Sequence, residues 1–104
     1  MKEQNKNLVR EEVMKIEQLR TKIDEIDMVI IPLLAKRFLI TEKIGILKAA
    51  NTLSAQDVAR ESEQFRKIKK VALCNGLNPD YAKEIYRCVM DIVISRHKEI
   101  KHLK

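Results

Sequence analysis

The segment that decides the fold runs from Leu19 to Leu47 and reads LRTKIDEIDMVIIPLLAKRFLITEKIGIL. Its apolar residues recur at intervals that place side chains on one face of an α-helix. They are Leu19, Ile23, Ile26, Ile30, Leu33, Leu34, Ile40, Ile44 and Leu47. Pro32 should bend the helix because it removes a backbone donor, but no turn residues surround it. The pattern therefore predicts one long helix over about residues 8–50.

A second helix is predicted after the break at Asn51–Ser54. Ser54, followed three residues later by Asp57, resembles a helix N-cap. The helix should run to Cys74, because Asn75-Gly76 is a favourable C-cap pair. Its apolar side is expected to carry Phe65, Ile68 and Val71/Ala72.

A third helix is predicted from Pro79 to about His102, since Asn78-Pro79 combines a cap with Pro at the first helical position. The residues expected to point inward are Tyr81, Ile85, Cys88, Val89 and Ile92. The fold class is therefore all-α, with one long and two shorter helices.

The composition agrees with an all-helical chain that forms a single domain over residues 1–104. The 104 residues include two Gly, two Pro and no Trp. Cys74 and Cys88 form no paired motif, and we interpret them as reduced, small core residues of a cytoplasmic protein. The longest apolar run, Met28–Ala35, is too short for a membrane span, and the amino-terminal residues lack the apolar core of a signal peptide.

The helix lengths predict a dimer. A helix of some forty residues is about 60 Å long, while each of the other two spans roughly half of that. The short helices cannot cover the long one within a single chain, so another protein surface is needed. A two-fold homodimer is the simplest solution.

The net charge of +6 has its excess at the carboxyl terminus. The residues there are Arg96, His97, Lys98, Lys101, His102 and Lys104. Such a cluster attracts nucleic acid or small anions, but it also suits an ordinary solvated helix end. The two His are five residues apart, off the spacing of a helical metal pair, so no metal site is predicted.

Charged residues on the predicted helices define a candidate anion site. Arg37 and Lys48 are eleven residues apart and share a helix face to within about 20°. Arg20 is about 25 Å from Arg37 along the helix, but it approaches a partner's Arg37 and Lys48 if long helices pair antiparallel. Asp57, Arg60 and Glu61 follow Lys48 through a short loop. Arginines bind carboxylates through paired hydrogen bonds, yet the spacing alone favours ordinary surface charges on amphipathic helices.

These residues resemble the all-α, intertwined-dimer class of chorismate mutases. The matching pieces are LRTKIDEID (Leu19–Asp27), LLAKR (Leu33–Arg37), Lys48, DVARE (Asp57–Glu61) and NGLNPDYAKEIY (Asn75–Tyr86). The resemblance covers residues 19–97. It implies a homodimer with two shared sites, a chorismate substrate, no cofactor, and neither nucleic acid nor membrane as partner.

The resemblance also implies the role of each residue. Arg20 of one chain and Arg37 of the other would bind the two substrate carboxylates. Lys48 would hydrogen-bond the ether oxygen as its bond breaks. Glu61 would accept from the ring hydroxyl with help from Asp57, and Arg60 would lie beside them.

Two positions depart from the family pattern, and they leave alternatives open. His97 stands where the family usually has Gln or Glu facing the ether oxygen, and Val93 replaces a Ser that helps bind a carboxylate. One alternative is isochorismate-pyruvate lyase of the same fold, although Asp57 and Glu61 favour the mutase. Another is a non-enzymatic helical dimer that binds an anionic partner. An amino analogue of chorismate as substrate, the pathway served and feedback regulation stay open.

Overall fold

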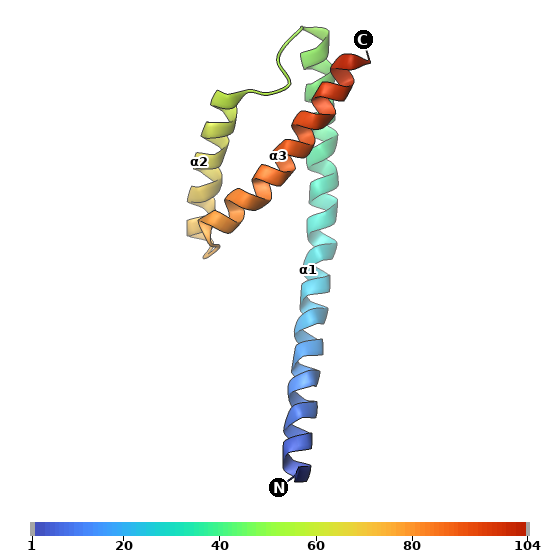
Figure 1. The fold of residues 1–104 in the computed structure, drawn as a ribbon, viewed down its shortest axis with the longest axis vertical. Coiled ribbons are helices and arrows are strands. Elements are labelled where there is room, and N and C mark those ends of the chain that lie inside the picture. Colours follow the sequence, from blue (N-terminus) through green and yellow to red (C-terminus); the bar gives the residue numbers. More distant parts are fainter. Residues whose placement is uncertain (1, 104) are drawn as a thin grey trace. The chain divides into compact units, whose positions relative to one another are not determined.

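The computed structural model of this chain describes the backbone of residues 2–103 and the side chains of residues 9–103. These residues form three helices and no strand: α1 (Lys2–Ala50), α2 (Val58–Cys74) and α3 (Pro79–His102) (Figure 1). The predicted all-α fold with one long and two shorter helices is confirmed. The chain divides into two compact units, Met1–Arg37 and Phe38–Lys104, and each is described by itself.

α1 begins earlier than predicted, at Lys2 rather than near residue 8, and continues through Pro32. Its end is set by two backbone hydrogen bonds that close the last turn. Leu53 N donates to Lys48 O at 2.8 Å, and Thr52 N donates to Ala49 O at 3.4 Å. Thr52 has a positive φ of 54°, the left-handed conformation that this type of helix end requires.

α2 starts at Val58 because Asp57, not Ser54, is its N-cap. The Asp57 carboxylate accepts from the backbone N of Arg60 at 3.0 Å. Ser54 instead accepts from Gln56 N at 3.3 Å within the preceding loop. The prediction of Ser54 as the cap was therefore wrong, because its hydroxyl serves a local turn one step before the helix.

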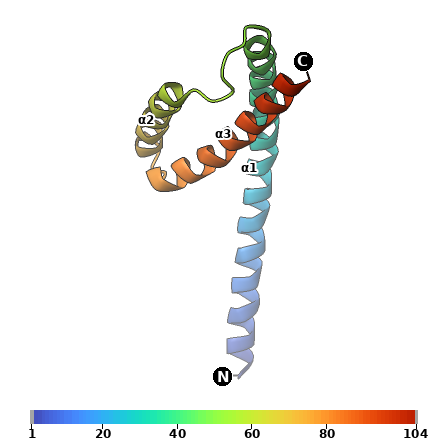
Figure 2. The ribbon, with the colours of Figure 1, turned by 45° about the horizontal axis from the view of Figure 1, so that its top comes forward.

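The turn between α2 and α3 has the predicted chemistry. Gly76 adopts φ 69°, and Leu77 N donates to Ala72 O at 2.9 Å, which closes the end of α2. The Asn78 side chain accepts from Asp80 N at 2.9 Å, and Pro79 occupies the first turn of α3. α3 then runs back toward the carboxyl-terminal part of α1, as two views of the second unit show (Figures 1 and 2).

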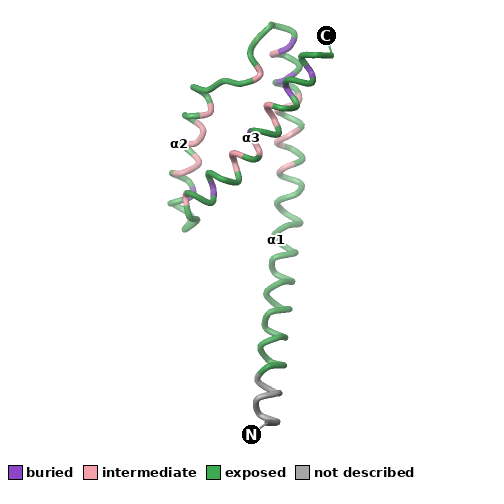
Figure 3. The backbone as a smooth tube through the Cα atoms, in the orientation of Figure 1, coloured by how far each residue is buried: buried purple, intermediate pink, exposed green. Residues whose placement is uncertain are grey.

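The buried residues of the second unit lie on a different side of α3 from the one predicted. The buried residues of α3 are Ala82, Met90, His97 and Ile100, and the tube of Figure 3 has short purple stretches along this helix. Of the five residues expected to point inward, Tyr81, Ile85, Cys88 and Ile92 are exposed and Val89 is half-buried. The prediction of that inward face was wrong for the single chain, because α3 packs through its small Ala82 and through His97 instead. Cys74 is also exposed, so neither cysteine is a core residue here.

Most apolar residues in the described part of the first unit are exposed. Leu19, Ile23, Ile26, Ile30 and Leu33 are all among the exposed large hydrophobic residues, and the tube of Figure 3 is green over this part of α1. Such a continuous apolar series on one helix is typical of a surface that another protein covers. Within the described part of the chain, no helix has the length and apolar character needed to cross a membrane.

Candidate active site

His97 joins α3 to the carboxyl-terminal part of α1. Its side chain is only 4% exposed, and its Nε2 lies 2.8 Å from the backbone O of Thr41. Because a carbonyl oxygen can only accept, Nε2 must carry the proton. The ring lies over Gly45, where an added Cβ would be 2.5 Å from His97 Cδ2. Glycine at this helix-interior position therefore permits the close approach of the imidazole.

Lys48 lies on the same face of α1 as the His97 contact. Thr41, Gly45 and Lys48 are spaced by four and three residues, which places them one above the other on a helix. Lys48 is half-buried, and its Nζ lies 3.5 Å from the carbonyl oxygen of Ala55 in the loop before α2. A hydrogen bond of this length is weak, so the ammonium group can exchange it for a ligand.

Asp57 and Arg60 are both exposed at the start of α2. Asp57 is occupied as the N-cap through its Oδ1, which leaves its other oxygen available as an acceptor. Asp57, the first residue of the charged stretch DVARE, thus has a structural function as the N-cap of α2.

Glu61 accepts hydrogen bonds from residues of both α3 and the loop before α2. Both of its carboxylate oxygens accept from Arg87 on α3, at 3.2 Å each. Gln56 Nε2 lies 3.4 Å from each oxygen as well. The hydrogen bond from Arg87 is the main cause of a lowered Glu61 pKa. Glu61 is therefore ionised near neutral pH and acts only as an acceptor.

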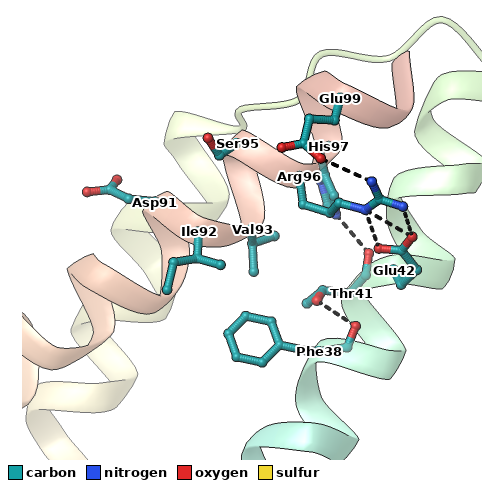
Figure 4. Close-up of a pocket in the computed structure, with 10 residues that line it drawn as sticks. All are labelled: Phe38, Thr41, Glu42, Asp91, Ile92, Val93, Ser95, Arg96, His97 and Glu99. Carbon is teal, nitrogen blue, oxygen red and sulfur yellow. Dashed lines mark hydrogen bonds and ion pairs between the residues drawn. The ribbon is translucent and has the colours of Figure 1, made fainter. Parts of the chain in front are cut away.

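A cavity of about 600 Å³ opens beside His97, between α3 and residues 38–42 of α1. Phe38, Ile92 and Val93 give it an apolar wall, and Ser95 lies on the other side of the α3 ribbon from Val93 (Figure 4). The Val93 side chain supplies no hydrogen-bonding group to this cavity. Lys48 and Glu61 do not line this cavity.

The rim of the cavity is held by an ion-pair network. Arg96 Nη2 lies 2.7 Å from Glu42 Oε1, and Arg96 Nη1 lies 3.1 Å from Glu99 Oε2 (Figure 4). The hydrogen bond from Arg96 lowers the pKa of Glu42. Two members of the basic carboxyl-terminal cluster, Arg96 and His97, are thus engaged with α1 rather than free at a solvated helix end.

The two remaining predicted residues belong to the first unit. Arg20 is exposed, and its Nη1 pairs with Glu17 Oε1 at 2.7 Å. Arg37 is half-buried at the end of that unit. The other five predicted residues, Lys48, Asp57, Arg60, Glu61 and His97, belong to the second unit.

The sequence reasoning did not single out Arg87, Thr41 or Gly45. Arg87 and Asp91 are four residues apart with opposite charges, a spacing that indicates an ion pair on α3. Gly45 is the one glycine of a long helix, where it costs about 1 kcal/mol relative to Ala. Such a glycine indicates close packing against another element. The contribution of Thr41 comes from its backbone and leaves no signal in its side chain.

The polar side chains described above lie on the three helices of an all-α chain, which is the fold class that the sequence resemblance implies. A comparison with protein-family models makes that class specific. Residues 19–98 match the family described as chorismate mutase type II. The chain therefore belongs to that family, and the match agrees closely with the range of the sequence resemblance. A search of curated proteins found no match to the chain.

Proposed function

We propose that this protein is a chorismate mutase that converts chorismate to prephenate in a site formed by two chains. The observation that carries the proposal is the family match over residues 19–98. That range contains Arg20, Arg37, Lys48, Glu61 and His97, together with Asp57 and Arg60.

The reaction is an intramolecular rearrangement, so the protein needs no nucleophile and no acceptor for a leaving group. The ether C–O bond breaks while a new C–C bond forms, and no atom leaves the molecule. Catalysis then consists of holding a compact conformer and stabilising negative charge that develops on the ether oxygen. Lys48 is the residue proposed to donate to that oxygen.

Two features of the second unit support these assignments. The weak 3.5 Å bond between Lys48 Nζ and Ala55 O costs little to exchange for a substrate oxygen. Arg87 keeps Glu61 ionised by lowering its pKa, so that Glu61 can accept a hydrogen bond from the ring hydroxyl. In this proposal Asp57 and Arg60 support Glu61 at the start of α2.

The role of His97 is proposed with one condition. In the single chain its Nε2–H donates a hydrogen bond to Thr41 O. Its buried Nδ1 has no hydrogen-bond partner among the described residues. A hydrogen bond from His97 to the ether oxygen therefore requires either a proton on Nδ1 or an exchange of the Thr41 contact.

The second chain is proposed because the first unit leaves its apolar residues exposed. Leu19, Ile23, Ile26, Ile30 and Leu33 flank Arg20 or follow it on α1. A partner that covered these residues would also bring its own Arg20 toward this site. Arg20 would then bind one carboxylate and Arg37 the other, through paired charge-assisted hydrogen bonds.

The test is to incubate the purified protein with chorismate, and separately with isochorismate, and to identify the products by NMR. Prephenate from chorismate supports the mutase. Pyruvate and salicylate from isochorismate, with chorismate unchanged, would instead identify the lyase of the same fold. If neither substrate changes, the activity is refuted. A non-enzymatic dimer would also show no rise in melting temperature with a dicarboxylate transition-state mimic.

Variants test the site itself. Lys48→Ala should lower kcat by about 10²–10³-fold or more, as expected for loss of a donor to a developing oxyanion. The dimer should persist by size-exclusion chromatography with light scattering. Wild-type turnover in this variant would refute the role of Lys48.

Mixing two inactive variants tests the shared site. Heterodimers of Arg20→Ala and Lys48→Ala chains contain one site with both residues intact, so activity should partly recover after subunit exchange. Exchange can be verified by mass spectrometry of the native dimer. No recovery in verified heterodimers would contradict a site that takes Arg20 from the partner.

A further inference from the structure

Arg87 connects the proposed hydroxyl-binding residue to the body of α3. We propose that Arg87 is a positioning residue that fixes the orientation of the Glu61 carboxylate and thereby selects a substrate with a hydrogen-bond donor at that point. This inference rests on the proposed function, because it assigns Glu61 to substrate binding.

The first argument is the geometry of the pair. Arg87 Nη1 donates to Glu61 Oε2, and Nη2 donates to Oε1, both at 3.2 Å. Two parallel hydrogen bonds define the plane of a carboxylate as well as its position. The Glu61 side chain is only 15% exposed and that of Arg87 is 37% exposed, so the pair is partly sheltered from water. Exposed pairs elsewhere on the chain, such as Arg66 with Glu63, lie within one helix and constrain no second element.

The second argument is that Arg87 is itself held. Its Nε donates to Asp91 Oδ1 at 2.9 Å, and its Nη2 lies 2.7 Å from the same oxygen. Its guanidinium carbon lies 5.5 Å from the centre of the Phe65 ring on α2, within the range of a cation–π contact. A guanidinium fixed by a carboxylate and a ring has little freedom, and Glu61 therefore takes up the orientation that Arg87 imposes.

The third argument concerns charge. Arg87 carries one positive charge, while Glu61 and Asp91 carry two negative charges between them, so the group of three retains one net negative charge. Arg87 thus orients Glu61 without cancelling its character as an acceptor. Each carboxylate oxygen has two lone pairs, so one remains beside the bond to Arg87. Gln56 Nε2 contacts it only at 3.4 Å, a long and weak hydrogen bond that a ligand can replace. A ligand with a hydroxyl fits this place, whereas one with a carbonyl or ether oxygen would leave two acceptors facing each other.

An NMR titration tests the effect of Arg87 without reference to substrate. The protein is labelled with ¹³C at glutamate side-chain carboxyls, and the Glu61 signal is assigned with Glu61→Gln. In Arg87→Gln, Glu61 should titrate at a higher pH than in the wild type, because the main cause of its lowered pKa is removed. Arg66→Gln, which removes an α2 arginine that pairs with Glu63 instead of Glu61, is the matched control and should leave the Glu61 midpoint unchanged. An unchanged midpoint in Arg87→Gln would overturn the proposal.

Kinetics test the positioning role. Arg87→Gln should raise KM for chorismate about tenfold or more, and in a Glu61→Gln background the same change should have no further effect. Arg87→Lys keeps the charge but cannot form two parallel hydrogen bonds to Glu61. Its KM for chorismate should therefore also be higher than that of the wild type. Additive effects of the Arg87 and Glu61 changes, or a wild-type KM in Arg87→Lys, would overturn the positioning role. If the wild type leaves chorismate unchanged, the proposed function fails, and the NMR titration alone decides the effect of Arg87 on Glu61.

Discussion

The close contact between Gly45 and His97 predicts that Gly45→Ala changes the stability in opposite directions with and without the His97 ring. Gly45→Ala alone should destabilise the protein, although alanine is the better helix former. The added Cβ would lie 2.5 Å from His97 Cδ2, 2.9 Å from His97 Nε2 and 3.0 Å from Ile100 Cδ1. The Ile100 methyl is the end of a flexible side chain and can move aside. The imidazole cannot move without losing its bond to Thr41 O.

The magnitude follows from two opposing effects. Alanine in place of glycine inside a helix stabilises by about 1 kcal/mol. Either the ring stays in place and is overpacked, which costs about 1–3 kcal/mol, or it is displaced and Nε2 is left unsatisfied, which costs about 1–3 kcal/mol instead. With about 2 kcal/mol as the central cost, Gly45→Ala should be destabilising by about 1 kcal/mol net. In His97→Ala the ring is absent, so the same change should stabilise by up to about 1 kcal/mol.

The assay is thermal unfolding by circular dichroism of four proteins at one concentration: wild type, the two single variants and the double variant. Equal concentration matters because association changes the melting temperature. Each kcal/mol corresponds to about 4 °C or more for a domain of this size. The effect of Gly45→Ala on the free energy of unfolding should differ by about 2 kcal/mol between the wild-type and His97→Ala backgrounds. This difference is the coupling energy between positions 45 and 97. Equal effects of Gly45→Ala in the two backgrounds would refute the close contact between helix and imidazole.

Two further predictions concern capping and acid stability. Asp57→Ala should destabilise the protein by about 1 kcal/mol, measured by denaturant titration, because it removes the N-cap of α2. Ser54→Ala should have a much smaller effect in the same measurement. A larger effect of Ser54→Ala than of Asp57→Ala would contradict the assignment of Asp57 as the cap. The carboxyl groups of Glu42 and Glu61 have a lowered pKa in the folded chain, caused chiefly by Arg96 and Arg87 respectively. Their stabilisation is fully present above the ordinary pKa of 4.5 and is lost as the pH falls through the lower folded values. Glu42→Gln should therefore flatten the loss of stability below pH 4.5, and an unchanged pH profile would argue against the Arg96 pair.

The helices were predictable because their signals are local. Asn75-Gly76 and Asn78-Pro79 satisfy the conformational needs of a helix end and a helix start, and both have the predicted role. The start of α2 was harder, since Ser54 and Asp57 are both suitable N-cap residues. The choice between them depends on where the chain emerges from the end of α1, which is set by the bond from Leu53 N to Lys48 O.

The inward side of α3 could not be read from its periodicity. Apolar residues occur on more than one side of this helix, so the spacing of Tyr81, Ile85 and Ile92 defines a stripe without saying what covers it. In the single chain this stripe is exposed, and the helix packs through Ala82 and His97 instead. Small side chains permit close approach but contribute little to a hydrophobic pattern, which is why the pattern missed them.

The candidate site was predicted for residues whose side chains carry a charge, and not for contacts made by the backbone. Lys48 and Glu61 stand out in the sequence because of their charge and spacing. Arg87 was overlooked because its partners Glu61 and Phe65 are on another helix, and no local pattern connects them. Such contacts depend on the packing of α2 on α3.

The bond from His97 to Thr41 O also determines how the chain can change in evolution. Because the acceptor is a main-chain oxygen, a change of the Thr41 side chain leaves the acceptor in place. The constraint falls instead on position 45, where there is room for a ring only when no Cβ is present. Among relatives, positions 45 and 97 should therefore covary, with glycine accompanying a bulky partner, whereas position 41 should drift independently of both. Homologous sequences alone would then reveal the steric contact and conceal the hydrogen bond.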